Sequence, residues 1–600
     1  MRPTPLAKFA DKPYIVRLPD QRLGAFFFKP LDGAEESVAR YSGQHIAARF
    51  SRDHGLTWTD EQHVLTLPLE HGGWFRQDGF DALVDDEGEV HLFFLNDAHT
   101  GVVPAPKGKE LPSGEEQRPQ AGQLREKRLD IWHTRSTHGR TRWPQPRRLW
   151  TGYSGAINSV LQLRSGRIVL PFSFLTSRKW RDNRGPGPDQ FTFKGQYDCT
   201  VLYSDDRGAT WKESPTPVNV PVPDIVSAYG AVEPVVSQLK DGRAWMMIRT
   251  QMGRFYESFS EDGATWTPPT PTHLLSSDSP PAIVSLDDGR LVIFWNNCLR
   301  FPYAFGGRHI MHAAISDDDG RTWKGHREVA LDPERDKPPP PWGDHGMGYP
   351  FASVTTDNKI ILSTGQGASR DAALLVDPSW LYETNQKEDF SEGLKMWSTF
   401  GTRGVELQNH PQKKSRRVLS MRKTHREWPA AAVWNFPCTA KGSLRMRILV
   451  KRGFRGARIS LTDHFSVPYD SEDWFHSLFN LELDDHLGAS PESLNSEVGT
   501  DRRAVRCAAA RPAVAPYHQQ GNLLSGHALK LTTGKWHDLE FKWNCARQQC
   551  VVSAGGKRAA FLPLLRASGG PSYVRVKSTA QDLNDSGLLI EQIETKKPNP

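Results

Sequence analysis

Cysteine is scarce in this chain, with six among 600 residues, at positions 199, 298, 438, 507, 545 and 550. A disulfide scaffold needs a far higher density, and no C-x-x-C or H-E-x-x-H motif indicates a zinc site. Cys545 and Cys550 are close enough in sequence for a bridge, but two unpaired thiols in a strand or turn are the preferred interpretation. The sequence therefore predicts neither a metal site nor a cofactor.

Long apolar runs are missing as well. No window reaches the roughly 18 uninterrupted apolar residues of a membrane-spanning helix. The first residues, "MRPTPLAKFADKPYIV", contain no apolar core of a signal peptide. We therefore expect no membrane span. We also expect either a cytoplasmic protein or a secreted or periplasmic one whose leader has been removed.

A strong charge of one sign is also absent. The net charge of +7 comes from 76 basic and 69 acidic residues, which is too weak a surplus to predict a nucleic-acid partner. It is compatible with a small anionic substrate. With 50 glycines and 44 prolines, the composition favours many short strands joined by turns. The length allows one large domain built from repeats with an addition, or several domains.

Six segments share a strand–turn–strand pattern. Each has β-branched or aromatic residues on both sides of a turn that carries Gly or Asp, which is the signal of a β-hairpin. Their starts are about 50–80 residues apart, the spacing of a structural repeat. The six segments are 14–28, 81–95, 159–172, 234–248, 282–295 and 351–363.

A short box with Ser, Asp, Gly, Thr and Trp recurs after most of these segments. The copies are "SRDHGLTW" (51–58), "SDDRGATW" (204–211), the shortened "SEDGATW" (260–266) and "SDDDGRTW" (316–323), with a degraded "STHGRTRW" at 136–143. Ser and Asp accept bonds from turn amides, Gly adopts positive φ, and Trp covers the junction. The box lacks the later acidic ligands of a calcium loop. We therefore interpret it as the turn of a second hairpin.

Two hairpins per repeat make a four-stranded unit. Six such units predict an all-β chain that begins with a six-bladed β-propeller over residues 1–382, closed by strands such as 371–378. A β-sandwich and a seven-bladed ring are the alternatives. Residues 383–600 show further strand patterns at 442–453, 456–467, 535–543 and 549–556. They predict one β-sandwich (jelly-roll) domain, with a long loop over 484–527.

The boxes resemble the Asp boxes, or BNR repeats, of the sialidase (neuraminidase) superfamily, and the resemblance covers residues 14–382. It implies an exo-acting glycoside hydrolase that releases a terminal sialic acid or a related acidic sugar from an oligosaccharide or polysaccharide. It also implies a retaining mechanism with a Tyr–Glu nucleophile pair, three arginines that bind a carboxylate, and an aspartate as acid/base.

Four residues match this pattern. In "AVEPVVSQLKDGRAWMMIRT", Glu233 precedes a strand–turn–strand that ends in Arg249. Arg308 stands shortly before the box at 316, and Tyr349 opens the last inner strand in "GDHGMGYPFASV". A tyrosine hydroxyl is a poor nucleophile at neutral pH, so an adjacent carboxylate such as Glu233 would take its proton. Arginine binds carboxylates through paired bonds better than lysine does.

Two members of the family pattern have no direct match. The position of the first arginine falls near Asp11 and Lys12, so Lys12 is the candidate substitute, while Arg17 comes later on the strand. The loop ahead of the first box offers Glu35 and Glu36 but no aspartate.

Other residues are therefore candidates for the acid/base and for substrate binding. Asp81 opens the second inner strand, with Arg76 and Asp78 just upstream. His45 and His345 are candidates because the imidazole of histidine can serve as an acid or a base near neutral pH. Asp278, ahead of the fifth inner strand, is a weaker candidate.

Three alternatives to a sialidase stay open. The first is a glycosidase for another sugar. The second is a lyase in which Tyr349, with His45 or His345, abstracts a proton next to a uronic carboxylate. The third is a carbohydrate-binding propeller without catalysis.

The C-terminal region resembles a laminin-G or concanavalin-type sandwich. Its tryptophans either stack on sugar rings or fill the core. They are Trp380, Trp397, Trp428, Trp434 and Trp474.

Overall fold

A computed structural model describes most of the chain. The residues it describes are 3–6, 13–30, 43–67, 74–102, 125–178, 195–221, 230–298, 307–337, 345–365, 372–469, 476–484, 504–509 and 530–596. Within these ranges the fold is all-β, and the one helical element is a 3₁₀ turn, η3 (Pro378–Tyr382). The predicted all-β class is confirmed.

The chain divides into two compact units. Unit 1 comprises 1–321, 329–332 and 344–380, and unit 2 comprises 322–328, 333–343 and 381–600. No helix of the described residues is long and apolar enough to cross a membrane.

The first half of unit 1 forms an eight-stranded sheet, ordered β2-β3-β4-β6-β7-β8-β9 with β5 on β4. A single residue pair, Gly43 with Phe75, joins β4 to β6 and so links two four-stranded groups. The strands are β2 (Tyr14–Arg17), β3 (Leu23–Pro30), β4 (Gly43–Ser51), β5 (Gln62–Thr66), β6 (Trp74–Val84), β7 (Val90–Val102), β8 (Arg125–Arg135) and β9 (Arg147–Trp150).

Three more sheets have four consecutive strands each. The first has β10 (Leu161–Gln162), β11 (Ile168–Arg178), β12 (Gly195–Ser204) and β13 (Lys212–Glu213). The second has β14 (Val232–Gln238), β15 (Ala244–Arg249), β16 (Arg254–Ser260) and β17 (Thr270–Leu275). The third has β18 (Ala282–Ser285), β19 (Leu291–Trp295), β20 (Ile310–Ser316) and β21 (Lys324–Leu331).

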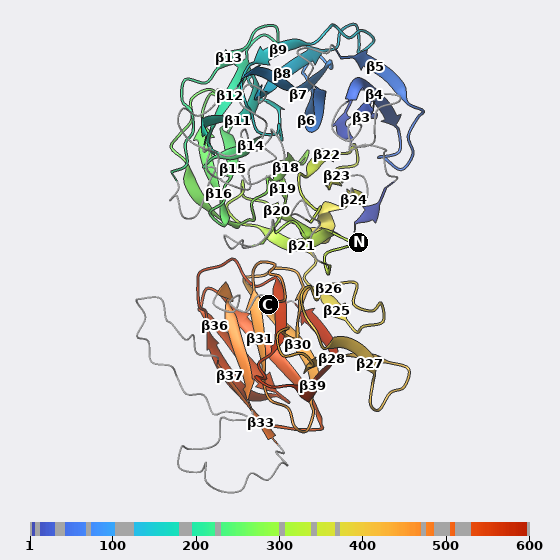
Figure 1. Cartoon of the computed structure of the whole chain (residues 1–600), viewed down its shortest axis with the longest axis vertical. Coiled ribbons are helices and arrows are strands. Elements are labelled where there is room, and N and C mark those ends of the chain that lie inside the picture. Colours follow the sequence, from blue (N-terminus) through green and yellow to red (C-terminus); the bar gives the residue numbers. More distant parts are fainter. Residues whose placement is uncertain are drawn as a thin grey trace. The chain divides into compact units, whose positions relative to one another are not determined.

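The last sheet of this part of the chain joins its two ends. Its order is β1 (Thr4–Pro5), β24 (Ala372–Val376), β23 (Ile360–Thr364) and β22 (Phe351–Val354). Figure 1 shows the sheets of unit 1 following one another around a common centre, from blue β3 to yellow β24. The first strands of the groups line this centre, since β2 packs against β6 and β22, and β18 packs against β14 and β22.

All six predicted hairpins are confirmed as antiparallel pairs, from β2–β3 to β22–β23. The box at 51–58 forms the turn between β4 and β5. Ser51 Oγ accepts the amide of Gly55 at 2.9 Å, and Asp53 accepts the amide and hydroxyl of Thr57 at 2.8 and 2.6 Å. The shortened box at 260–266 forms a different turn, in which Asp262 Oδ1 accepts the amides of two successive residues, Ala264 and Thr265.

Unit 2 contains two antiparallel sheets. One is ordered β27-β28-β39-β30-β35-β36-β37 with β25 on β39, and the other β26-β29-β38-β31-β32-β33-β34. The bounds are β25 (Gln386–Glu388), β26 (Trp397–Ser398), β27 (Val405–Asn409), β28 (Arg417–Lys423), β29 (Ala431–Asn435), β30 (Lys441–Val450), β31 (Ala457–Thr462), β32 (Phe479–Asp484), β33 (Ala504–Ala509), β34 (Lys530–Thr532), β35 (Trp536–Asn544), β36 (Gln549–Ala554), β37 (Lys557–Pro563), β38 (Tyr573–Ser578) and β39 (Asn584–Lys596).

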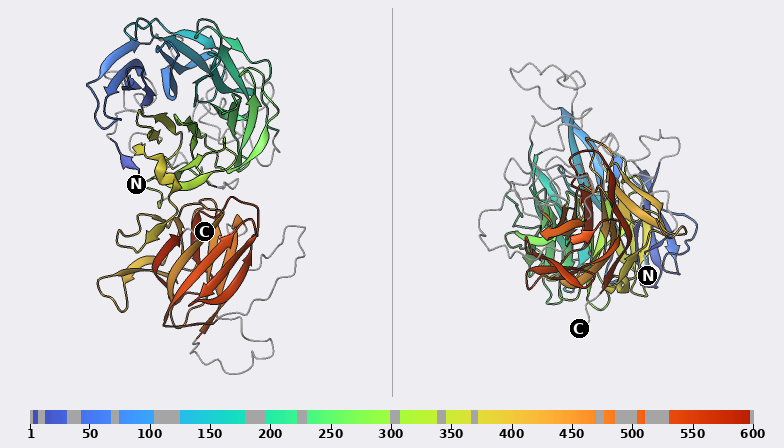
Figure 2. Two further views of the ribbon diagram at one scale, coloured as in Figure 1. Left: turned by 180° about the vertical axis from the view of Figure 1, so that it is seen from behind. Right: turned by 90° about the horizontal axis from the view of Figure 1, so that it is seen from below.

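One hydrophobic core holds side chains of both sheets, among them Met446 and Phe541 of the first and Ile459 and Val574 of the second. Figure 2 shows the strands of this unit in orange and red from two further directions. The four strands predicted here are confirmed as β30, β31, β35 and β36.

The structure also tests the predicted loop and the two neighbouring cysteines of unit 2. The loop prediction for 484–527 is wrong at β33, because Ala504–Ala509 pairs with β32 and β34 inside that range. The rest of the predicted loop after Asp484 lies outside the described residues. Cys545 and Cys550 are free thiols, as preferred.

Candidate active site

Tyr349 and Glu233 form a direct hydrogen bond. The Tyr349 hydroxyl donates to Glu233 Oε1 at 2.9 Å. Tyr349 lies two residues before β22, and Glu233 is the second residue of β14, so each stands at the start of an inner strand. The carboxylate is buried, whereas the tyrosine is half-buried. A phenol beside a carboxylate is the arrangement of a nucleophile with its base.

Both residues have left-handed backbones, with φ of +48° at Glu233 and +50° at Tyr349. Such a conformation costs a non-glycine residue about 1–3 kcal/mol and persists only where its surroundings impose it. At Glu233 the β14–β15 register shifts between Val232 and Val235, which turns the carboxylate out of the strand. The amide of Glu233 donates to Ser173 Oγ at 3.1 Å. These contacts hold the strained residue in place.

Arg249 is the third member of the cluster and sits opposite Val232 at the end of β15. Its Nη1 donates to Glu233 Oε2 and, at 3.2 Å, to the Tyr349 hydroxyl oxygen. Its Nε donates to Asp278 Oδ1 at 2.8 Å. The guanidinium is buried, so its charge acts on its neighbours with little screening by water.

Arg308 completes the group of four that sequence reasoning had predicted. Its Nη2 donates to the Asp278 carbonyl at 2.8 Å, and its Cζ lies 5.1 Å from the centre of the Tyr349 ring. Its own carbonyl accepts the amide of Met347 at 2.9 Å, two residues before Tyr349. Residues associated with two sheets, β14–β17 and β18–β21, therefore converge on the tyrosine that precedes β22 in a third.

Asp278 has a role that the sequence did not reveal. The sequence predicts it only as a weaker acid candidate, whereas in the structure it bonds Arg249 through its carboxylate and Arg308 through its carbonyl. Gln251 Nε2 also donates to Asp278 Oδ2 at 2.8 Å. The available signal was its position just ahead of the inner strand β18. Asp81, which the sequence predicted to open its inner strand, lies inside β6 instead.

His345 lies in the segment that leads to Tyr349 and is buried. Its Nδ1 is 3.2 Å from Asp332 Oδ2, and its ring packs on that of His309 with centroids 4.1 Å apart. Asp332 also accepts the amide of Gly346 at 2.8 Å. In this position His345 anchors the segment before Tyr349, and its part in substrate binding stays a prediction.

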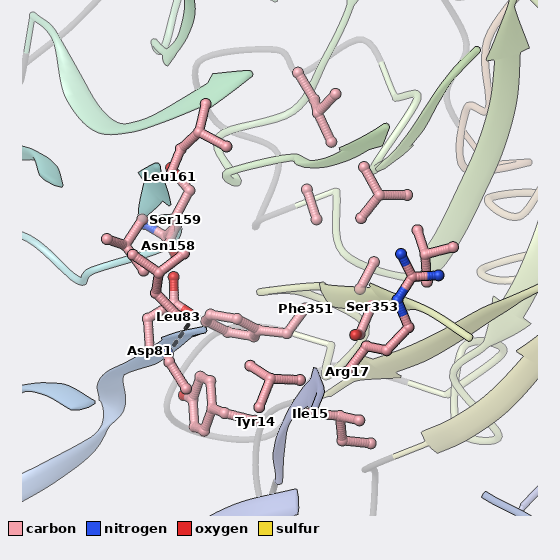
Figure 3. Close-up of a pocket in the computed structure, with 18 of the residues that line it drawn as sticks. Tyr14, Ile15, Arg17, Asp81, Leu83, Asn158, Ser159, Leu161, Phe351 and Ser353 are labelled. Atoms are coloured by element: carbon pink, nitrogen blue, oxygen red, sulfur yellow. Dashed lines mark hydrogen bonds between the residues drawn. The ribbon is translucent and has the colours of Figure 1, made fainter. Parts of the chain in front are cut away.

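Asp81 lines a cavity of about 370 Å³ between the inner strands. Tyr14 and Phe351 line the same cavity, and Figure 3 shows Asp81 near Phe351, with Arg17 beside Ser353 farther along. Removal from water raises the pKa of Asp81 to about 7, although the amides of Ala82 and Val160 donate to it and oppose the rise. A carboxyl group with this pKa is protonated in part at neutral pH, as a general acid must be.

The remaining predicted residues lie elsewhere or outside the described part. His45 is on β4, where its Nδ1 contacts Thr66 Oγ1 of β5 at 3.1 Å. Arg76 is in β6, but its side chain is outside the described residues, as are Lys12, Glu35 and Glu36 entirely. Arg17 pairs with Asp287 at 3.0 Å, and its guanidinium also donates to the carbonyl of Thr355 at 3.4 Å.

The cluster as a whole balances two carboxylates, Glu233 and Asp278, against two guanidinium groups, Arg249 and Arg308. Across the described ranges, no group of three or more His, Cys, Asp or Glu side chains could hold a metal ion. Together with Tyr349, these residues offer nucleophilic attack by a tyrosine with base assistance, next to fixed positive charge.

Comparisons with known proteins give one family match and several distant structural likenesses. A protein of unknown function from Dyadobacter fermentans DSM 18053 has a TM-score of 0.42 and 18% identity, over 63% of this chain and 98% of that chain. Trypanosoma rangeli sialidase has a TM-score of 0.37 and 13% identity, over 98% of this chain and 91% of that chain. The Hadza microbial sialidase Hz136 has a TM-score of 0.42 and 14% identity, over 62% of this chain and 66% of that chain. No curated protein matches. The model of the BNR repeat-like domain matches residues 46–362, more than half of the chain.

Proposed function

The chain belongs to the BNR repeat-like domain family of the sialidase superfamily, and from this premise we propose that it is a retaining glycoside hydrolase with Tyr349 as nucleophile. The enzyme is exo-acting and releases a terminal sialic acid or a related acidic sugar. The observation that carries the proposal is the 2.9 Å bond from the Tyr349 hydroxyl to Glu233. Sialidases are the tyrosine-nucleophile exception among retaining glycosidases.

The reaction has two steps. As the Tyr349 oxygen attacks the anomeric carbon, Glu233 takes the phenolic proton, and the bond to the leaving oxygen breaks. Arg249 Nη1, at 3.2 Å, stabilises the charge that develops on the phenolic oxygen. Asp81 donates a proton to the leaving group. Water then cleaves the tyrosyl–sugar bond, with Asp81 as the base that accepts the proton of this water and Glu233 returning a proton to Tyr349.

The substrate carries a negative charge. Arg308 over the Tyr349 ring provides a buried cation close to the reacting oxygen. Arg249 is bonded to Glu233 and Asp278, and Arg308 is bonded to the Asp278 carbonyl, so both guanidinium groups are fixed where they can bind the substrate carboxylate. Lys12, Arg76, His45 and His345 stay predictions as substrate-binding residues.

We interpret the architecture around this site as a six-bladed β-propeller over residues 1–382, followed by a β-sandwich over 383–600. Four sheets of four strands and one sheet of two four-stranded groups support six blades. The two antiparallel sheets with a common core support the sandwich.

Covalent trapping tests the proposal. The protein is incubated with 2,3-difluorosialic acid, digested and examined by mass spectrometry, beside a panel of fluorogenic glycosides of acidic sugars. Tyr349 should carry the sugar, and Tyr349→Phe should lose both label and turnover. Tyr203→Phe, which removes a hydroxyl from a half-buried tyrosine on β12, is the control.

Three results would contradict the proposal. The first is turnover by Tyr349→Phe. The second is a product with new ultraviolet absorbance, which would identify a lyase. The third is binding of acidic sugars without any product release, which would identify a binding protein.

A further inference from the structure

The tryptophans of the C-terminal region separate into two kinds. Trp380, Trp397 and Trp434 are 4%, 1% and 1% exposed and fill cores. Trp474 lies outside the described residues. Trp428 lies in the segment between β28 and β29. Its side chain is 39% exposed and is therefore accessible to solvent.

Tyr469 is the other exposed aromatic side chain in the described part of the chain, at 42%. Among the large apolar side chains that the structure describes, four are exposed, and the remaining two are leucines, Leu56 and Leu583. Single exposed apolar residues are ordinary. Here, however, both exposed aromatic rings belong to unit 2 and contact the same short segment, residues 400–403.

Residues 400–403 connect the two rings. Tyr469 packs on the ring of Phe400, with centroids 5.5 Å apart, and lies so close over Gly401 that a Cβ there would be 2.8 Å from it. Two residues further on, the Arg403 guanidinium lies 5.4 Å from the centre of the Trp428 ring. We call Trp428, Tyr469 and the segment 400–403 between them the aromatic platform.

The Trp428 end of the platform is basic. Residues 422–428 read "RKTHREW", with three basic residues and one acidic one. Lys423 Nζ donates to the Trp428 carbonyl at 3.2 Å, which brings its charge beside the ring. Together with Arg403 this places two cations within reach of a ligand that covers Trp428.

We propose that the aromatic platform binds acidic polysaccharide. Indole and phenol rings present flat apolar faces against which the C–H face of a pyranose packs. Arg403 and Lys423 then pair with carboxylates of the chain. The platform holds a polymeric substrate independently of the Tyr349 cluster.

Affinity electrophoresis of the full chain tests this site. Every protein carries Tyr349→Phe, so that the polymer is not degraded, and gels contain polysialic acid, polygalacturonate or neutral dextran. Trp428→Ala and Tyr469→Ala should each raise the dissociation constant for an acidic polymer about tenfold. Arg403→Gln should weaken retardation by acidic polymers and reduce its dependence on salt. Leu583→Ala, at an apolar position that is exposed outside the platform, is the control.

Unchanged retardation of the double variant Trp428→Ala/Tyr469→Ala would overturn the site. Equal retardation by dextran would overturn its acidic specificity. Thermal melting of each variant separates lost binding from lost folding. Because the assay needs no turnover, an absence of hydrolase activity leaves its outcome unaffected.

Discussion

Arg249 donates through Nε to Asp278 Oδ1 at 2.8 Å, so a carboxylate from the adjoining sheet holds the cation beside Tyr349 and Glu233. The bond joins the end of β15 to the segment before β18. Because Arg249 also bonds Glu233, the orientation of the nucleophile pair depends on Asp278 through Arg249.

Asp278→Asn should lower kcat/KM by about 100-fold, because small misplacements of reacting groups have effects of this size. Weakening a bond to a charged partner should also lower the free energy of unfolding by about 2 kcal/mol. Asp288→Asn, which disturbs the half-exposed pair with Arg290, should change neither. Equal activity of Asp278→Asn and the parent would remove Asp278 from the site.

Asp81 should control the alkaline side of the pH profile. An acid with a pKa of about 7 loses its proton as the pH rises, so kcat/KM should fall above about pH 7. Asp81→Asn should have low activity without this alkaline limb. Measurements of kcat/KM from pH 5 to 9 check this, with exposed Asp60→Asn as the control.

The same residue should affect stability. The pKa of Asp81 in the folded state is raised above its value near 4 in the unfolded chain. The stability that protonated Asp81 contributes is therefore fully present below about pH 4 and is lost as the pH rises through about 7. The difference in stability between Asp81→Asn and the parent should therefore be more favourable to the variant at pH 8 than at pH 4. An equal difference in Tm at both pH values would contradict the burial of a charged carboxylate.

A buried histidine pair should make the protein sensitive to acid. His91 Nδ1 lies 2.9 Å from His133 Nε2, and His91 Nε2 lies 3.1 Å from Asp85 Oδ2. Burial lowers the pKa of both histidines, most strongly for His133, where the neighbouring charges of His91 and Arg147 lower it further. The unfolded chain therefore binds more protons below about pH 6.5, and stability should fall as the pH drops from there.

His133→Phe should reduce the dependence of the unfolding free energy on pH between pH 4.5 and 6.5. The reduction should correspond to up to one fewer proton taken up on unfolding. The phenylalanine ring can replace the contact of the imidazole with Trp211, whose ring centre is 5.5 Å away. Exposed His63→Gln should keep the slope of the parent. Urea unfolding at several pH values provides the measurement, and an unchanged slope in His133→Phe would contradict the prediction.

Gly155 should be needed for the position of Glu233. A Cβ at Gly155 would lie 2.3 Å from Ser173 Oγ and 3.2 Å from Glu233 Cγ. Gly155→Ala should lower kcat at least tenfold and destabilise the fold by about 1–3 kcal/mol through overpacking. Gly569→Ala, where a Cβ meets nothing within 4 Å, should leave both unchanged. Full activity of Gly155→Ala would show that Glu233 tolerates displacement.

Local patterns in the sequence predicted much of this fold. Hairpins and Asp boxes could be located because the bonds that define them join residues close in sequence, such as Ser51 to Gly55 and Asp53 to Thr57. The sequence did not predict β33, because its partners β32 and β34 lie about 20 residues away on either side and no short hairpin turn joins them to it.

The four residues of the cluster were predicted by resemblance rather than by local physics. Glu233, Arg249, Arg308 and Tyr349 are spread over 117 positions, and only the arrangement of the sheets brings them together. The role of Asp278 was not predictable, because its partner Arg249 belongs to a different sheet.

The sequence by itself determined the all-β class, the repeated hairpins and the family, because turns and strand periodicity are encoded by neighbouring residues. The tertiary structure alone decided which charges meet at Tyr349, why Asp81 has a raised pKa, and which tryptophan stays exposed. These properties depend on burial and on distances between residues far apart in the chain, which no local pattern records.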